Sequence, residues 1–148
     1  MDSTKNFGLY MDKVLKTIKL NYLKAFKELG LNFTPEQWVI LDILYKEDGV
    51  SQTELAIGSF KDSPTVSRII DLLEKKELVT RMRFENDRRR YKIFLTEKGQ
   101  TDYDIALPAV NELREKSWEN LSEEDYKTYL RIMSQIVKNF DDKKALHH

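Results

Sequence analysis

The sequence predicts a mostly α-helical protein that contains one small β-hairpin. Through most of the 148 residues, apolar side chains recur every three to four positions, which is the spacing of amphipathic helices. Residues 79–84 and 91–95 are instead rich in β-forming side chains and are separated by six polar residues. That pattern is typical of a hairpin with an exposed loop. Repeated helix-start signals divide the remaining chain into several helices.

The composition excludes several classes of protein. The chain has no cysteine, so it has no disulfide, no thiol switch, no cysteine nucleophile and no cysteine-liganded metal. The two histidines, His147 and His148, end the chain, and we interpret residues 147–148 as a remnant of a purification tag. No apolar run is long enough to span a membrane, and residues 1–6 do not form a signal-peptide core. We therefore expect a cytoplasmic protein without a cofactor, a metal or a membrane partner.

The charges balance over the whole chain but not locally. Lys plus Arg and Asp plus Glu both number 25, so the formal net charge is zero. Residues 81–92, however, hold six cations and only two anions, a local charge of +4. The hairpin is therefore a concentrated basic segment on an acidic body, which favours an anionic partner.

The first predicted helix covers residues 7–29 and ends at Gly30, a residue typical of helix C-termini. Its apolar stripe is wide and is formed by Phe7, Met11, Val14, Leu15, Ile18, Tyr22, Leu23, Phe26 and Leu29. A stripe of this width favours a partner helix, such as one from a second copy of the chain. The alternative is that the helix covers only its own core.

The second helix begins with an explicit start signal. Thr34 is a good N-cap, Pro35 suits the first helical position, and Gln37 completes a capping box. Phe33 and Trp38 flank this box as a hydrophobic staple.

The same pattern recurs at Ser51 and Glu54, which predicts that a third, short helix begins at Gln52. Pro64 is tolerated only in a first helical turn, so a fourth helix begins there, capped by one of the two preceding residues. Its expected buried face is formed by Val66, Ile69, Ile70 and Leu73. Its expected outer face is formed by Thr65, Ser67, Arg68 and Asp71.

Two more helices are expected after the hairpin. Thr96 caps one that runs toward Trp118 and is interrupted or bent near Pro108. Ser122 caps the last helix, whose apolar stripe is formed by Tyr126, Tyr129, Leu130, Met133, Ile136, Val137 and Phe140. The terminal helices thus present apolar faces with little intervening chain to cover them.

Helix, turn, helix and basic hairpin, in that order, are the pattern of a winged helix-turn-helix. The hydroxyls at the start of the fourth helix suit bases or phosphates, and Arg68 suits guanine. An Arg at the hairpin tip suits a minor groove, and Asp87 is expected to orient a neighbouring guanidinium. The alternative for the hairpin is a solvated charged loop.

These motifs together resemble the MarR family of transcriptional regulators. The segments that carry the resemblance are Thr34-Pro35-Glu36-Gln37-Trp38, Ser51-Gln52-Thr53-Glu54-Leu55-Ala56, Thr65-Val66-Ser67-Arg68, Leu78-Val79, Asp87-Arg88-Arg89 and Leu95-Thr96-Glu97-Lys98-Gly99. The resemblance implies a homodimer that binds a pseudo-palindromic operator in double-stranded DNA, and repression that a small ligand relieves.

By position, the resemblance also implies a division of the chain and a set of contacts. Residues 1–30 would form an N-terminal dimerisation helix, residues 31–99 the winged helix-turn-helix lobe, and residues 100–146 the C-terminal dimerisation helices. The residues implied or expected to contact DNA are Gln52, Thr53, Ser63, Pro64, Thr65, Ser67, Arg68, Asp87, Arg88, Arg89 and Arg90. In this chain Ser59-Phe60-Lys61 replaces the apolar residue and Gly that relatives often carry before the recognition helix, which leaves the register of base contacts open.

The resemblance implies aromatic or phenolic ligands bound between the dimer helices and the DNA lobe. Tyr22, Phe26, Trp38 and Tyr45 are the candidates for such a site, and ordinary core packing is the alternative. A second alternative concerns function: a winged helix that contacts proteins without sequence-specific DNA binding. An enzyme is not expected, because the chain has no histidine outside its tail, no cysteine and no Gly-rich phosphate loop.

Overall fold

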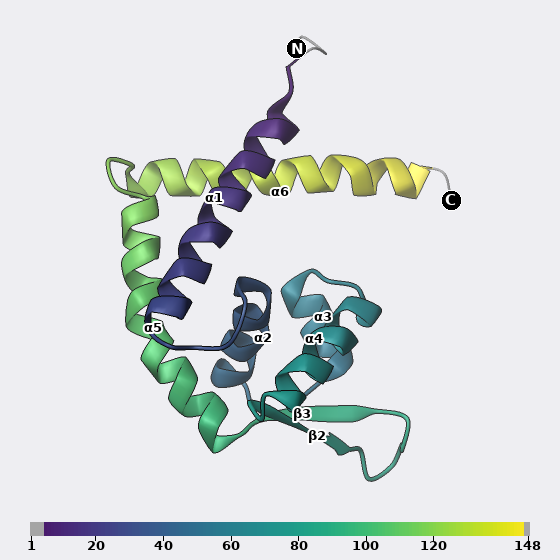
Figure 1. Cartoon of the computed structure of the whole chain (residues 1–148). Helices are drawn as coiled ribbons and strands as arrows, with labels where there is room; N and C mark the ends of the chain where they lie inside the picture. The colour runs from purple at the N-terminus through teal and green to yellow at the C-terminus, as the bar shows by residue number, and fades with distance from the viewer. Residues whose placement is uncertain (1–4, 147–148) are drawn as a thin grey trace. The chain divides into compact units, whose positions relative to one another are not determined.

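The computed structural model describes residues 5–146, and the side chains of residues 5–141 (Figure 1). Residues 147–148, interpreted above as a tag remnant, lie outside the described residues. The helices are α1 (Phe7–Glu28), α2 (Pro35–Lys46), α3 (Gln52–Ser59), α4 (Ser63–Lys75), α5 (Glu97–Ser117) and α6 (Glu123–Leu146). The chain divides into two compact units between Leu113 and Arg114. None of the described helices is long and apolar enough to span a membrane.

A three-stranded antiparallel sheet follows the order β1-β3-β2. Its strands are β1 (Val50–Ser51), β2 (Val79–Arg83) and β3 (Tyr91–Leu95). The β2–β3 hairpin confirms the sequence prediction, and its loop extends away from the helices (Figure 1). Strand β1 was not predicted, because a strand of two residues is too short to show alternation. This strand exists through long-range pairing, in which Val50 lies opposite Ile93.

The first helix-start signal is formed as expected. The amide of Gln37 donates to the Thr34 hydroxyl at 3.2 Å, and the amide of Thr34 donates to the Gln37 side-chain oxygen at 3.1 Å. The second signal is only half formed. The Glu54 amide donates to the Ser51 hydroxyl at 3.0 Å, but the Glu54 carboxylate accepts from that same hydroxyl and not from the Ser51 amide. The Ser51 backbone instead belongs to β1.

The turn between α3 and α4 has the left-handed geometry that glycine usually supplies. Phe60 adopts φ 58° and ψ 33°, and the Lys61 amide donates to the carbonyl of Ala56 at 3.1 Å. This is a common way to end a helix, here with an aromatic residue in the position that favours glycine. The cap of α4 is Asp62, whose carboxylate accepts from the Thr65 amide at 2.8 Å.

The core of the first unit lies between α2, α4, the sheet and α5. The face of α4 that was expected to be buried is buried, with Val66, Ile70 and Leu73 fully inaccessible. Helix α5 adds Tyr103, whose ring stacks on Trp38 at 4.5 Å between centroids and whose hydroxyl donates to Asp42 at 2.6 Å. This core fixes the positions of α3, α4 and the sheet relative to one another.

Helix α5 was expected to be interrupted or bent near Pro108. Of these two alternatives the interruption is absent, because one helix continues through Pro108 from Glu97 to Ser117. A proline removes one backbone hydrogen bond, and the buried contacts of Tyr103 and Val110 on either side of Pro108 hold the helix across that loss. Its start is capped as expected, because the Gly99 amide donates to the Thr96 hydroxyl at 2.9 Å.

The second unit contains the end of α5 and α6. Ser122 caps α6 as expected: the Asp125 amide donates to the Ser122 hydroxyl at 3.0 Å, and the Ser122 amide donates back to the Asp125 carboxylate at 2.9 Å. The rings of Trp118 and Tyr126 meet edge to face at 5.0 Å. No residue of α6 with a described side chain is fully buried.

Candidate nucleic-acid interface

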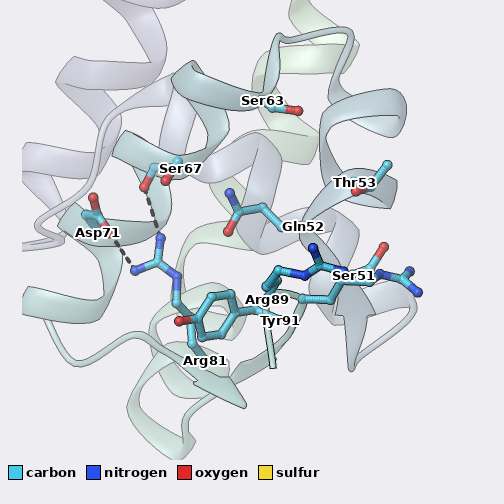
Figure 2. Close-up of a pocket in the computed structure, with 10 residues that line it drawn as sticks. Ser51, Gln52, Thr53, Ser63, Ser67, Asp71, Arg81, Arg89 and Tyr91 are labelled. Atoms are coloured by element: carbon cyan, nitrogen blue, oxygen red, sulfur yellow. Dashed lines mark hydrogen bonds and ion pairs between the residues drawn. The ribbon is translucent and has the colours of Figure 1, made fainter. Parts of the chain in front are cut away.

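A polar hollow of about 430 Å³ lies where the start of α3, the outer face of α4 and the base of the hairpin meet (Figure 2). It is lined by Ser51, Gln52, Thr53, Ser63, Ser67, Asp71, Arg81, Arg89, Arg90 and Tyr91. Hydroxyls, an amide and guanidinium groups thus gather on one surface, although they come from segments up to 40 residues apart. Six of the eleven residues implied to contact DNA line this hollow.

The start of α3 presents donors toward the hollow. Gln52 and Thr53 occupy its first turn, and their backbone amides have no carbonyl four residues earlier in the helix to bond. The Glu54 amide is already bonded to Ser51. Free amides at a helix N-terminus suit a phosphate, so the geometry agrees with the phosphate role expected for Gln52 and Thr53.

The start of α4 is less suited to phosphate than the sequence suggested. Pro64 has no amide hydrogen, and the amide of Thr65 is bonded to the Asp62 carboxylate. That carboxylate also places a negative charge at the positive end of the helix. The backbone amides at the start of α4 are therefore largely taken up by its own cap, and phosphate contacts there depend on the side-chain hydroxyls.

The side chains of α4 remain available to a ligand. Ser63 and Arg68 are exposed, and Ser67 is half-buried and lines the hollow. The Arg68 guanidinium donates to the Thr65 hydroxyl at 3.3 Å, which orients both groups on the outer face of the helix. This helix can therefore contact base edges through side chains, with Pro64 exposed at its first turn.

Arg81 has a different role from the other cations of the hairpin. It extends from β2 to α4, where it donates to the Asp71 carboxylate and to the carbonyl of Ser67 at 3.2 Å (Figure 2). It also donates to the Glu74 carboxylate at 3.3 Å. Its side chain is only 15% exposed. The charge of Arg81 is thus paired within the protein. The net charge that residues 81–92 can offer to a partner is therefore +3 and not +4. The contact fixes the base of the hairpin against the fourth helix.

The hairpin loop places Asp87 against one arginine. The Asp87 carboxylate accepts from the backbone amide of Arg89 at 3.0 Å and from its guanidinium at 3.3 Å. Asp87 was expected to orient a neighbouring guanidinium, and in the described part of the chain that guanidinium is the one of Arg89. The Arg89 side chain stays 92% exposed, so it is oriented at its base and free at its end.

The four aromatic candidates for a ligand site belong to a cluster of stacked rings. Phe26 and Trp38 are core residues, 0% and 2% exposed, and their centroids are 5.7 Å apart. Tyr22 packs edge to face on Phe26 at 6.1 Å, and Tyr45 stacks on Tyr103 at 4.1 Å. Packing contacts with other rings thus explain the positions of all four aromatic side chains. A role for them in ligand binding stays a prediction.

Four of the ten residues that line the hollow were not among those expected to contact DNA. Ser51 was expected only as a cap, Tyr91 only as a strand residue, Arg81 only as one more cation, and Asp71 only as part of the outer face of α4. The sequence does show that Asp71 and Glu74 share one face of α4 and could pair with a cation. It gives no local indication that this cation is Arg81 on β2. Within the described residues, no group of three or more acidic, histidine or cysteine side chains could hold a metal ion.

The fold and this surface define a winged helix-turn-helix module. Comparison with known proteins then specifies it further. A family model described as "MarR family" matches residues 33–91. The HTH-type transcriptional regulator MgrA of Staphylococcus aureus is 30% identical over 123 residues, which cover 82% of this chain and 80% of MgrA. The chain therefore belongs to the MarR family of DNA-binding transcriptional regulators.

Solved structures share the same fold. The S. aureus MepR–DNA complex superposes with a TM-score of 0.82 at 23% identity, covering 91% of this chain and 98% of that one. The PcaV transcriptional regulator of Streptomyces coelicolor, solved with its natural ligand, superposes with a TM-score of 0.79 at 16% identity, covering 93% and 96%. Since both identities are low, these likenesses concern the fold.

Proposed function

We propose that this protein is a cytoplasmic homodimeric regulator that binds a pseudo-palindromic operator in double-stranded DNA and represses transcription until a small aromatic or phenolic ligand releases it. The observation that carries the DNA part is the polar hollow, where the α3 start, α4 and the basic hairpin supply donors to one surface. The MepR–DNA complex, which shares the fold, supports the same use of it.

The proposed contacts divide by chemistry. Ser63, Thr65, Ser67 and Arg68 face a major groove with Pro64 beside them, and Gln52 and Thr53 contact backbone phosphate. The hairpin tip enters a minor groove, where Arg88 and Arg89 meet the strongest negative potential and Asp87 orients Arg89. Arg90 contributes a further cation beside the tip.

Apolar exposure on the terminal helices supports a dimer. Leu9, Tyr10 and Val14 on α1 are 60%, 72% and 57% exposed, and Val137 and Phe140 on α6 are 62% and 66% exposed in the single chain. Exposed apolar faces of this kind mark association surfaces. In a two-fold dimer the two α4 helices would enter successive major grooves about one turn, roughly 10 base pairs, apart.

Release by a ligand requires that the ligand bind better to a conformation that does not fit DNA. The PcaV complex with its natural ligand supports ligand binding on this fold. Tyr22, Phe26, Trp38 and Tyr45 are the proposed contacts; because Phe26 and Trp38 are buried, a ligand that used them would have to displace ring stacking. A titration of aromatic acids into the protein–DNA complex tests this part, and unchanged DNA affinity would count against it.

The DNA function is tested by selecting bound sequences from random duplexes with the purified protein. We expect an inverted repeat with half-sites about one helical turn apart. Arg68→Ala should reduce enrichment of the preferred bases, while Arg88→Ala and Arg89→Ala should each weaken binding strongly. Absence of any enriched sequence would contradict specific recognition and would favour the second candidate, a winged helix that binds a protein partner.

A further inference from the structure

The hairpin carries an aromatic residue that no part of the proposed DNA contact set uses. Phe84 directly follows β2, and its amide donates to the carbonyl of Arg90 at 3.0 Å. The β2–β3 register places Arg83 opposite Tyr91 and Met82 opposite Lys92, so Phe84 lies opposite Arg90. Side chains of Phe84, Arg90 and Lys92 therefore share one face of the hairpin, because alternate strand residues point to the same side.

Both cations lie over the Phe84 ring. The guanidinium carbon of Arg90 is 4.4 Å from the ring centroid, and the Lys92 ammonium nitrogen is 5.1 Å from it. Both distances are within the range of a cation–π contact. Neither cation has an ion pair with a carboxylate in the described part of the chain, in contrast to Arg81.

We propose that Phe84 is a positioning residue that holds Arg90 and Lys92 ready to bind two DNA backbone phosphates beside the hairpin tip. This inference rests on the proposed DNA function and extends it to a ring and to Lys92, which the sequence did not assign to DNA. The hairpin then has two kinds of contact: the tip with Arg88 and Arg89, and the Phe84 face with Arg90 and Lys92.

Stacking on a ring leaves a guanidinium able to bind phosphate. A guanidinium whose face lies on a ring keeps its five N–H groups pointing outward in its own plane, where they can donate to phosphate oxygens. Ordering a long side chain before binding also removes part of the entropy that binding would otherwise cost. The ring therefore raises phosphate affinity without touching DNA.

The cations on the opposite face of the hairpin are held differently from Arg90 and Lys92. There, Tyr91 lies between Arg81 at 5.8 Å and Arg83 at 5.6 Å, and Arg81 is already held by α4. On the Phe84 face no acidic side chain competes for the two cations within the described ion pairs. The ring is thus the main group that orders Arg90 and Lys92.

The test measures binding of the 148-residue chain to a mixed-sequence duplex long enough for two half-sites, because phosphate contacts do not depend on sequence. Phe84→Leu removes the ring and keeps apolar volume; we expect about three- to fivefold weaker binding, the effect of losing cation–π contacts at an exposed site. Phe84→Trp keeps a ring and should bind like the original protein. Met82→Leu is the matched control, since Met82 is exposed on the same face, and it should have no effect.

A double variant separates positioning from folding. In Arg90→Gln/Lys92→Gln, the two hairpins of the proposed dimer together lose four phosphate contacts, so the slope of log affinity against log salt should decrease in magnitude by about 3.6. Phe84→Leu as a single substitution should leave that slope nearly unchanged. Added to the double variant, it should not weaken DNA binding further. A hairpin that unfolded would instead lose the contributions of all its arginines.

Three results would overturn the inference. Phe84→Leu could bind DNA as tightly as the unsubstituted chain, or it could weaken binding as much in the double variant as in the unsubstituted chain. The third is that Phe84→Trp binds as weakly as Phe84→Leu. Arg88→Ala, measured in the same titration, separates this failure from failure of the proposed function. If Arg88→Ala weakens binding and Phe84→Leu does not, only the inference fails. If the original protein does not bind duplex DNA at low salt, both fail.

Discussion

The guanidinium of Arg81 on β2 donates to the carboxylate of Asp71 on α4, so the base of the hairpin and the fourth helix are joined by a charge-assisted hydrogen bond. The same guanidinium also reaches Glu74 at 3.3 Å. Because Arg81 is only 15% exposed, solvent screens these contacts less than it screens those of the exposed loop. In addition to the shared core, this residue therefore holds the base of the hairpin against α4.

Replacing Arg81 should affect both stability and binding. Arg81→Met removes the hydrogen bonds to two half-exposed carboxylates and to the Ser67 carbonyl; because water can hydrate the carboxylates, we expect the free energy of unfolding to fall by only about 1 kcal/mol. DNA affinity should fall roughly tenfold, equivalent to about 1.4 kcal/mol, because the hairpin is no longer held against α4. Chemical denaturation and equilibrium DNA binding measure the two effects.

Arg83→Met is the matched control for that experiment. It removes one positive charge from the same face of the same strand, but Arg83 contacts only the Tyr91 ring, at 5.6 Å, among the described side-chain contacts. We expect unchanged stability and a smaller loss of affinity. Equal effects of the two substitutions would show that the contact to α4 has no special role.

The Phe60 turn gives a prediction about stability alone. A non-glycine residue in the left-handed region is strained, and the Phe60 side chain is 98% exposed, so it contributes little packing. Phe60→Gly should raise the free energy of unfolding by about 1 kcal/mol. Phe60→Ala keeps the strain and removes the ring, so it should leave stability unchanged; a loss of stability in Phe60→Ala would mean that the exposed ring has a stabilising contact.

Asp87 should act through orientation of Arg89. Asp87→Ala removes the contacts to the Arg89 amide and guanidinium, and we expect about threefold weaker DNA binding despite the loss of a negative charge. Asp87→Asn keeps an oxygen for the amide and should have an intermediate affinity. Tighter binding by Asp87→Ala would mean that removal of charge repulsion outweighs orientation. Thermal unfolding should be unchanged, because the Arg89 side chain is exposed.

The Asp62 cap gives a dependence of stability on pH. Hydrogen bonds from the backbone amide of Thr65 and then from its hydroxyl lower the pKa of Asp62 below its ordinary value of 3.8. A carboxyl whose pKa is lower in the folded state stabilises the fold above the unfolded value, and that stabilisation is lost as the pH falls through the folded value. Asp62→Asn retains a cap without the charge.

We therefore expect the original protein to lose more stability than Asp62→Asn as the pH is lowered from about 5 to about 3. Denaturation at several pH values in this range measures the difference. Parallel stability curves for the two proteins would show that the Asp62 charge does not stabilise the start of α4.

Much of the fold could be predicted because its signals are local. The Thr34 and Gln37 capping box, the Thr96 cap and the buried face of α4 all depend on residues within a few positions of one another. The hairpin was also visible from its β-forming residues and polar loop.

The parts that could not be predicted depend on distant residues or on context. Strand β1 exists only because Val50 meets Ile93, and the function of Arg81 depends on Asp71 in another element. The left-handed conformation of Phe60 has no signal in the sequence, since the usual residue there is glycine. In the candidate site, the residue types were predictable, but which cations are free and which are already paired was not.

The salt dependence of duplex binding tests the central claim most directly, because contact with phosphate releases counterions in proportion to the number of contacts. If the hollow and the hairpin bind DNA as proposed, log affinity should fall linearly with log salt with a slope of magnitude about 4 or more. Arg89→Ala removes one cation from each of the two hairpins of the proposed dimer, so it should reduce that magnitude by about 1.8. A slope near zero, or no binding at low salt, would contradict the account.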